Sequence, residues 1–285
     1  MTERVPPASH PFRKLSDDRS HDPSRELSHE RYCAEIVAQT GLLREHLAGA
    51  DLTATVPTCP DWSLRDLAVH VGAAHRWAET MVRTRASEVL DEDEVPDRVP
   101  QGEDAASLDS WLGAGAGRLA ETLRDAGPGV PVWTWAWRQD AAFWARRMTH
   151  ETVIHRADAA LAAQADYDVA PDVAADAIDE WLRIVRFAQD TDAADETQEL
   201  KAGGRTLHLH ATDTAPDVAA EWLIELADDG IVWRRDHAKA EVALRGPLTA
   251  VLLAFYRREA LDGGRVEVLG DRELLDFWLR RATFG

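Results

Sequence analysis

The sequence predicts an α+β protein in which a helical half precedes a smaller half that mixes strands with helices. Apolar residues recur at helical spacing as far as Asp190, and beyond Gly204 they alternate with polar residues, as in half-buried strands. The chain of 285 residues is also longer than the ~100–200 residues of a typical domain. Turn signals at Asp229-Gly230 and Gly263-Gly264 divide the second half into short segments. We therefore expect a helix bundle joined to a domain with a mainly antiparallel sheet.

This change of pattern divides the chain into three parts. Residues 1–27 are rich in Pro, Ser, Asp, His and Arg and have almost no apolar residues, which is typical of a disordered tail. We expect the helical bundle over residues 28–190 and the α+β domain over residues 204–285, with a polar link between them.

Residues that start helices help to place the five helices of the first half. Ser63 is followed three positions later by Asp66, a pair that caps the beginning of a helix. Pro171 suits a first turn, where its missing N–H is not needed. The predicted helices cover roughly residues 28–48, 63–87, 105–126, 139–165 and 171–189.

Three glycines, Gly113, Gly115 and Gly117, fall within the third of these helices. A phosphate-binding loop would need a preceding strand and a following Lys-Ser/Thr, and the sequence has neither at this point. We interpret the glycines as places where helices pack closely.

The second half contains five predicted strands and two predicted helices. The strands are Leu207–His210, Glu221–Leu226, Ile231–Arg235, Ala240–Arg245 and Arg265–Leu269, and the helices are Pro247–Leu261 and Asp271–Thr283. His208 and His210 point to the same face of the first strand, at a spacing that could ligate a metal ion. Because no carboxylate or cysteine lies near them in the sequence, a metal site there is the weaker interpretation.

Two helical stripes carry polar residues at positions that face the core. The stripes run Leu67, His70, Val71, Ala74, Ala78, Met81 and Trp144, Met148, Glu151, Thr152, His155, Ala159. An ionised carboxylate that faces a core is costly unless it is paired or bound to a metal ion. Glu151 and His155 are four residues apart, so a helix places both on one face.

We therefore predict that His70, Glu151 and His155 bind a metal ion. Two imidazoles and one carboxylate leave coordination positions open, which a catalytic metal needs and a structural metal does not. The alternative is a buried His–Glu hydrogen bond or ion pair without a metal.

The composition excludes several classes of function. The formal net charge is −19, and no cluster of Lys and Arg is dense enough to attract a nucleic acid. No apolar run approaches the ~20 residues of a membrane span, and Met1–Pro7 lacks the apolar core of a signal peptide. Since Cys33 and Cys59 are the only cysteines, we expect no disulfide framework and a cytoplasmic location.

The expected partner is a small-molecule substrate, and the chain is expected to be a monomer or a homodimer.

Two segments of the helical half resemble the metal-binding domain of the mycothiol-dependent maleylpyruvate isomerases. They are Val56–Gly72, with Cys59-Pro60-Asp61-Trp62-Ser63 in its first half, and Arg147–Asp158, which contains Glu151-Thr152-Val153-Ile154-His155. That domain belongs to the DinB-like four-helix superfamily. Residues Leu207–Asp271 are similar to the sterol-carrier-like domain that often follows it. The resemblance implies a DinB-like four-helix bundle with a smaller, sterol-carrier-like α+β domain.

The resemblance also implies roles for particular residues. In the family a metal ion, usually zinc, is held by one His and by the Glu and His of an E-x-x-x-H motif, and these positions match His70, Glu151 and His155. The same ligands also suit non-haem iron or nickel. The family isomerase depends on an arginine of its C-terminal domain. Arg257 and Arg258 are our candidates for that catalytic role, and an exposed position on a helix is the alternative for each.

Aromatic residues and a cysteine lie near the predicted site. Trp77 and Trp144 are candidates for binding the substrate, because both lie close to the ligands along the two helices, and packing in the core or between domains is the alternative, which we expect for most of the eleven tryptophans. Cys59 precedes the second helix, where a thiolate could be stabilised, but we interpret it as a small buried hydrophobic residue.

The implied activity is that of a metal-dependent enzyme with mycothiol as its thiol cofactor or co-substrate. A thiol coordinated to a metal ion is deprotonated, and a thiolate can isomerise a cis double bond or displace a leaving group. We therefore predict cis–trans isomerisation or thiol S-transfer on a small electrophilic substrate. The alternatives are a thiol-independent metalloenzyme of the same fold in small-molecule biosynthesis, and a non-catalytic binding or regulatory module.

Overall fold

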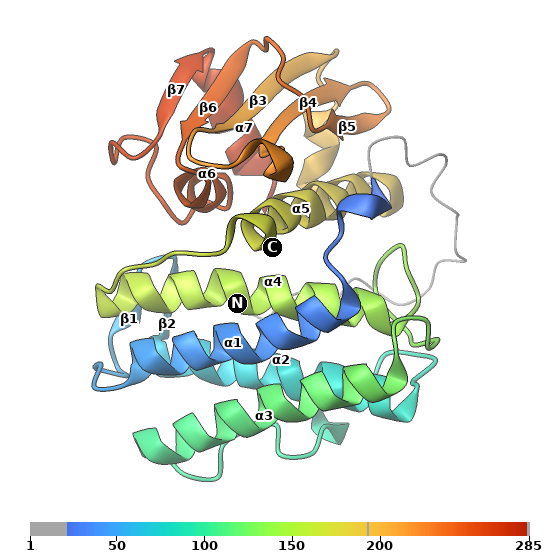
Figure 1. The fold of residues 1–285 in the computed structure, drawn as a ribbon, viewed down its shortest axis with the longest axis vertical. Coiled ribbons are helices and arrows are strands. Elements are labelled where there is room, and N and C mark those ends of the chain that lie inside the picture. Colours follow the sequence, from blue (N-terminus) through green and yellow to red (C-terminus); the bar gives the residue numbers. More distant parts are fainter. Residues whose placement is uncertain (1–21, 193, 284–285) are drawn as a thin grey trace. The chain divides into compact units, whose positions relative to one another are not determined.

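The computed structural model describes residues 22–192 and 194–283. The chain divides into two compact units, one formed by Leu27–Tyr167 and the other by residues from Asp168 onward together with residues 22–26. The first unit is mainly helical and the second combines a sheet with helices (Figure 1), so the predicted α+β class is confirmed. Across the described ranges, none of the helices has both the length and the apolar character needed to cross a membrane.

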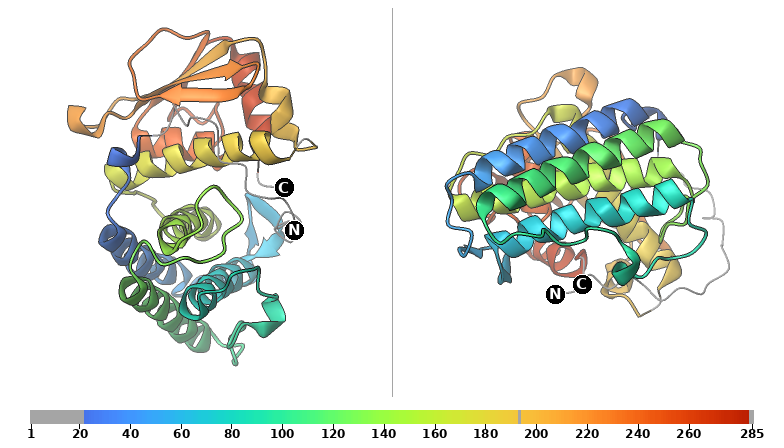
Figure 2. Two further views of the ribbon diagram at one scale, coloured as in Figure 1. Left: turned by 90° about the vertical axis from the view of Figure 1, so that its right-hand side faces the viewer. Right: turned by 90° about the horizontal axis from the view of Figure 1, so that it is seen from below.

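Four long helices form the first unit: α1 (His29–Leu47), α2 (Leu64–Thr84), α3 (Ala105–Ala126) and α4 (Ala141–Ala163). α1 and α2 each pack against both α3 and α4, so the helices form a four-helix bundle in which α1 lies diagonally opposite α2. Figure 2 shows this arrangement along the helix axes in its left view. Aliphatic side chains fill the core at one end, among them Leu43, Leu67 and Leu112. The ends of these helices lie within three residues of the predicted ends.

A short hairpin leads into α2, and the hydrophobic pattern does not predict it. Its strands are β1 (Thr55–Val56) and β2 (Cys59–Ser63), which are too short for an alternating pattern to be recognised. Ser63 ends β2 and also caps α2, where its hydroxyl and the Asp66 carboxylate form the expected capping box. The hairpin is thereby held at the start of α2.

The second unit is built around a five-stranded sheet with the order β5-β4-β3-β6-β7. β3 and β6 are parallel and the other neighbouring pairs are antiparallel, so the expectation of a mainly antiparallel sheet is confirmed. The elements are α5 (Pro171–Thr191), β3 (Arg205–Ala211), β4 (Glu221–Ala227), β5 (Gly230–Arg234), β6 (Val242–Gly246), α6 (Leu248–Phe255), β7 (Glu267–Gly270) and α7 (Arg272–Arg281). Short 3-10 helices occur at Pro23–Arg25, Glu92–Glu94, Glu196–Leu200 and Pro216–Val218.

α5 belongs to the second unit, so the division falls at Asp168 and differs from the predicted link after Asp190. α5 packs against β5 and α6. Its Asp179 accepts hydrogen bonds from the indole N–H of Trp222 at 2.7 Å and from Arg235 at 2.6 Å. Helical periodicity shows that α5 has an apolar face but not which element covers it, and for this reason the sequence groups α5 with the bundle.

The predicted disordered tail, residues 1–27, is described only in part. Residues 1–21 lie outside the described residues. Residues 22–27 correct the prediction, because they include a 3-10 helix and because Glu26 pairs with Arg183 of α5 at 3.3 Å. Composition cannot predict an ion pair between residues so far apart in the sequence.

Gly113 and Gly115 of α3 lie at contacts with other helices, which confirms the packing interpretation for these two glycines. A Cβ at Gly115 would lie 2.4 Å from the guanidinium of Arg76, and a Cβ at Gly113 would lie 2.9 Å from that of Arg44. Gly117 differs, because a Cβ there would meet nothing within 4 Å.

A glycine of α2 provides a test of the bundle's packing. We expect Gly72→Ala to destabilise the protein by ~1–3 kcal/mol, because its Cβ would lie 2.1 Å from the ring of Trp111 on α3. Gly117→Ala is the matched control and should stabilise by roughly 0.5–1 kcal/mol, since a helical glycine costs chain entropy. Urea unfolding measures both effects. Equal midpoints for the two variants would contradict the close approach of α2 and α3.

Candidate metal centre

Three side chains from α2 and α4 converge on one oxygen atom. The Nε2 atoms of His155 and His70 lie 2.9 and 3.2 Å from Glu151 Oε1. Ligand atoms of the three residues all lie within 4.8 Å of one another. The side chains are mostly buried but keep 11–22% of their surface exposed. The structure thus brings together the three residues that the sequence predicts as metal ligands.

The antiparallel alignment of α2 and α4 produces this convergence. Glu151 and His155 lie one turn apart on α4, and His70 faces them from α2. Further along α2, Trp77 contacts Trp144 near the start of α4, so the two helices run in opposite directions. A shift of one helical turn, about 5.4 Å, would separate His70 from Glu151.

Asp158 orients His155 from the side away from Glu151. His155 Nδ1 lies 2.9 Å from Asp158 Oδ2, an arrangement that directs Nε2 towards Glu151. The other oxygen of this fully buried carboxylate accepts a hydrogen bond from Thr58 Oγ1 at 2.6 Å. A histidine that ligates a metal ion almost always donates its second ring N–H to such a group. Asp158 and His155 therefore have the arrangement found around metal ions.

The sequence analysis does not identify Asp158 and Thr58 as parts of the site. Asp158 follows His155 by three residues on the same helix, and this spacing is a signal from which it could be found. Thr58 is 100 residues away from Asp158 and lies in the turn of the β1–β2 hairpin, so sequence spacing carries no signal for it.

The charges around Glu151 favour its ionised form. Burial alone would raise the pKa of Glu151, but the charge and hydrogen bond of His155, the hydrogen bond of His70 and the charge of Arg147 hold this pKa well below its usual range. Burial would also lower the pKa of His155, but the carboxylates of Glu151 and Asp158 raise it to about 9. Arg147 donates a hydrogen bond to Glu151 Oε2 at 2.9 Å, which leaves Oε1 facing the two histidines.

The β1–β2 hairpin covers the site with an aromatic ring. The ring of Trp62 lies 4.8 Å from that of His70 and 6.2 Å from that of His155, measured between centroids. Cys59, at the other end of β2, packs against the aliphatic core that includes Leu67. This position agrees with the interpretation of Cys59 as a small hydrophobic residue, but Cys59 is only partly buried, which corrects the expectation that it is buried.

His75 is a further buried histidine of α2 that is separate from the triad. Its Nε2 lies 2.8 Å from Thr152 Oγ1 on α4. Burial and the charge of Arg76 lower the pKa of His75 to about 4, so the ring is neutral near pH 7. His75 therefore supports the contact between α2 and α4 without adding a charge.

The predicted substrate-binding residues, Trp77 and Trp144, contact each other two helical turns from the triad. Their ring centroids lie 5.1 Å apart with nearly perpendicular planes. Trp77 follows His70 by seven residues and Trp144 precedes Glu151 by seven, a distance of about 10 Å along a helix. Each indole N–H already donates to a backbone carbonyl at 3.0 Å, so these residues can offer a substrate only their rings. Their role in substrate binding stays a prediction.

Arg257 and Arg258 lie in the second unit, in the turn after α6, and the prediction that they lie on a helix is wrong. α6 ends at Phe255, and Arg257 has a left-handed φ of 62°. The N–H groups of Arg257 and Arg258 donate back to the carbonyls of Ala254 and Leu253 at 3.0 and 2.6 Å. This pattern is a Schellman motif. The sequence predicts a longer helix because the left-handed position is usually glycine and here is arginine.

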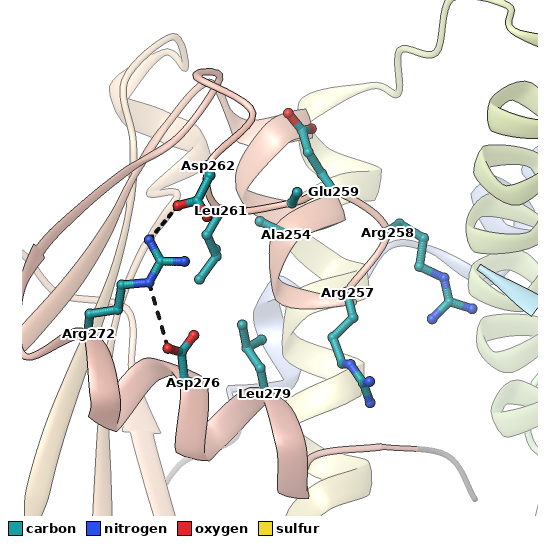
Figure 3. A pocket seen from close by; sticks show the side chains of 10 residues that line it. Ala254, Arg257, Arg258, Glu259, Leu261, Asp262, Arg272, Asp276 and Leu279 are labelled. Carbon is teal, nitrogen blue, oxygen red and sulfur yellow. Dashed lines mark hydrogen bonds and ion pairs between the residues drawn. The ribbon is translucent and has the colours of Figure 1, made fainter. Parts of the chain in front are cut away.

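Both arginines border a hollow of about 430 Å³ within the second unit (Figure 3). Arg272, which also lines the hollow, pairs with Asp262 at 2.6 Å and with Asp276 at 3.7 Å. Arg257 is exposed, whereas Arg258 is half-buried and donates to the backbone carbonyl of Tyr256 at 2.9 Å. The catalytic role of both residues stays a prediction.

Comparison with known proteins identifies the family of the two units. A family model described as the mycothiol maleylpyruvate isomerase N-terminal domain matches residues 33–160, and one described as the MDMPI C-terminal domain matches residues 172–277. The chain belongs to the mycothiol-dependent maleylpyruvate isomerase family. The first family model ends at residue 160, near the end of α4, and the second begins at residue 172, near the start of α5. The boundary between the two units along the chain, at Asp168, falls between these two positions.

Two solved structures share the fold of this family member. The crystal structure of the mycothiol-dependent maleylpyruvate isomerase is 16% identical to the chain with a TM-score of 0.55, and the match covers 85% of this chain and 93% of that one. The structure of a histidine-to-alanine mutant of the mycothiol-dependent maleylpyruvate isomerase is 15% identical, with the same TM-score of 0.55 and the same coverage of both chains. At this identity the likeness establishes the fold alone. No curated protein matches the chain in a sequence comparison.

The contact between Asp158 and His155 leads to a prediction about metal affinity. We expect Asp158→Asn to weaken zinc binding at the triad by ~10–100-fold, because the amide carries no charge to hold the proton on His155 Nδ1. Competition with a chromophoric chelator measures this affinity. Zinc binding at the triad is the binding event that is seen in the wild type and is missing in His70→Ala. Thr58→Ser keeps the hydroxyl that donates to Asp158 and should bind as the wild type does. Unchanged zinc affinity in Asp158→Asn would show that His155 does not depend on this carboxylate.

Proposed function

We propose that this chain is a metal-dependent enzyme that uses mycothiol, in the manner of the maleylpyruvate isomerases, on a small electrophilic substrate. The observation that carries the proposal is the convergence of His70, Glu151 and His155 in a unit that matches the family's N-terminal domain. The solved relatives are described as mycothiol-dependent isomerases, which supports the same thiol for this chain.

The donor set fits a divalent metal ion, and zinc is the ion we propose. Two imidazole nitrogens and one carboxylate oxygen are ligands that zinc accepts, and three protein ligands leave a position for an incoming group. His155 already has the orientation that this role needs, because Asp158 engages its Nδ1. Iron(II) and nickel accept the same donors, so the ligands favour the class of metal more strongly than zinc itself.

The residues around the triad prepare it for this chemistry. A zinc ion bound here would lower the pKa of a coordinated thiol and thereby supply a nucleophile at neutral pH. The Asp158 carboxylate, 2.9 Å from His155 Nδ1, favours a proton on that nitrogen, and Nε2 then faces the site. Arg147 holds the far oxygen of Glu151, and Trp62 covers the face of the His70 ring.

A thiolate nucleophile is consistent with two reactions. Reversible addition to a conjugated cis double bond allows rotation about the resulting single bond, and elimination then gives the trans isomer. Displacement of a leaving group by the same nucleophile transfers the thiol instead. The family supports isomerisation first, and S-transfer is the second reaction of the same site.

Turnover by the purified protein should require both mycothiol and a divalent metal ion. The assay uses maleylpyruvate and a panel of other electrophiles, with and without mycothiol, before and after treatment with a chelator. Turnover that persists without mycothiol would favour a thiol-independent metalloenzyme. Metal binding with no turnover on the whole panel would favour a binding module.

We expect His70→Ala to lose one equivalent of divalent metal and the mycothiol-dependent activity, because two protein ligands remain where three are needed. Elemental analysis and the same assay measure these losses, and circular dichroism checks that the helices remain. His29→Gln is the matched control, since its Nε2 meets the Leu123 carbonyl at 2.8 Å and takes no part in the triad. If His70→Ala keeps the metal content of the wild type, the proposed ligand set is wrong.

An anionic substrate needs a local positive charge in a chain with a net charge of −19. We expect Arg258 to supply it, because its guanidinium is half-buried and held by the Tyr256 carbonyl, whereas Arg257 is exposed. Arg258→Ala should lower kcat/KM by ~10-fold or more, the effect of a lost hydrogen bond to a charged group. Arg257→Gly should be nearly silent, since glycine suits the left-handed backbone at this position. Wild-type kinetics in both variants would exclude the two arginines from substrate binding.

A further inference from the structure

A cluster of three histidines and one glutamate lies on the sheet of the second unit. His208 and His210 come from β3, Glu221 from β4, and His237 from the loop between β5 and β6. Their ligand atoms lie within 4.8 Å of one another. Spacing along the sequence does not bring Glu221 near His210, but strand pairing places Glu221 directly opposite it.

The three strand residues of the cluster, His208, His210 and Glu221, lie on the face of the sheet that points away from α5. Trp222 of β4 points towards α5, because its indole N–H donates to Asp179 of that helix. Successive residues of a strand point to opposite faces, so Glu221 and its cross-strand partner His210 lie on the other face. His208 precedes His210 by two residues and shares that face.

The three imidazoles converge on a single atom, Glu221 Oε2. The distances to this oxygen are 2.6 Å from His237 Nδ1, 3.0 Å from His210 Nδ1 and 3.1 Å from His208 Nε2. The ring centroids form a nearly equilateral triangle with sides of 5.5, 5.6 and 5.5 Å. Four donors at about 2.0–2.1 Å from a tetrahedral zinc ion lie about 3.3 Å apart. The spacing between the imidazoles and Glu221 is close to that value.

Hydrogen bonding within the cluster leaves a buried nitrogen unsatisfied. His237 donates a hydrogen bond to Glu221, but His208 Nε2, at 3.1 Å from the same oxygen, lacks the geometry of one. His208 Nε2 has no hydrogen-bond partner among the described residues, although only 6% of the His208 side chain is exposed. A buried polar atom without a partner costs free energy. A cation at the centre of the cluster would satisfy it.

The cluster is accessible to an ion. Glu221 and His237 line a cavity of about 450 Å³ in the second unit, together with Arg235 and small residues that include Ala219 and Ala220. The side chain of His237 is 74% exposed and belongs to a loop, whereas the other three ligands stand on paired strands. Three ligands are therefore preformed, and the fourth is able to move as an ion enters.

We propose that His208, His210, Glu221 and His237 bind a second divalent transition-metal ion, with zinc as the expected ion. Imidazole nitrogens and a carboxylate oxygen suit zinc, and four protein ligands complete a tetrahedral shell, as structural zinc sites do. The ion would fasten the loop of residues 235–241 to β3 and β4. The proposal rests on the second unit alone and does not depend on the function proposed for the triad.

Zinc stoichiometry tests the proposal on the full-length chain without a polyhistidine tag. The protein is stripped with a chelator and then titrated with zinc chloride in a calorimeter, and the bound metal is counted by elemental analysis. We expect two zinc ions per wild-type chain, one in the double variant His208→Ala/His210→Ala, and one in His70→Ala. His237→Ala should weaken one of the two binding events by ~10-fold or more, because losing a ligand costs at least as much affinity as losing a hydrogen-bond partner of a ligand. Lys239→Ala changes an exposed residue of the same loop and should bind as the wild type does.

The proposal is overturned if the double variant still binds two zinc ions. It is also overturned if the wild type binds a single zinc ion and His70→Ala binds none. If the double variant does not fold, His237→Ala decides, because its exposed side chain is not needed for packing. Unchanged affinity for both ions in His237→Ala overturns the proposal, and selective weakening of one supports it. If the triad binds no metal, the wild type and His70→Ala should each bind one zinc ion, which is the ion of the second unit. This result would contradict the metal site proposed at the triad and not the site proposed here.

Discussion

The first unit depends on the burial of one ionised carboxylate between two antiparallel helices. Glu151 points into the contact between α2 and α4, where an unpaired charge would be strongly destabilising. His155 and His70 meet one of its oxygens and Arg147 meets the other, so positive and polar groups surround it. These partners come from both helices, and the register between α2 and α4 must be kept for the carboxylate to be satisfied.

The support for this carboxylate extends well beyond its immediate neighbours. His155 is held by Asp158, and Asp158 is held by Thr58 in the turn of the β1–β2 hairpin. The same hairpin places Trp62 over the ring of His70. A hairpin of few residues thus connects α2 with α4 and contacts two of the three candidate ligands, His155 through Asp158 and His70 through Trp62. A plain loop could also join α1 to α2, but it would not place Thr58 against Asp158 and Trp62 against His70.

The second unit also places imidazoles around one carboxylate, but on a sheet instead of on helices. In the bundle, one helical turn separates Glu151 from His155, whereas in the sheet a direct cross-strand pair joins Glu221 to His210. Both clusters centre on one carboxylate oxygen that imidazole nitrogens approach to about 3 Å. They differ in the number of ligands. Three protein ligands leave a position open for a reacting group, and four close the coordination shell.

The sequence by itself determined the α+β class, the ends of the long helices and the inward positions of His70, Glu151 and His155, because hydrophobic periodicity and helix caps are local properties. It could not determine that α5 packs on the sheet, since periodicity reveals an apolar face but not its partner. The sequence also did not predict the end of α6, because Arg257 has the left-handed backbone conformation for which glycine is usual. Only the tertiary structure decided which distant residues meet. Thr58 reaches Asp158 across 100 residues, and Glu221 joins His210 through strand register, because such contacts depend on how the elements pack and not on spacing along the chain.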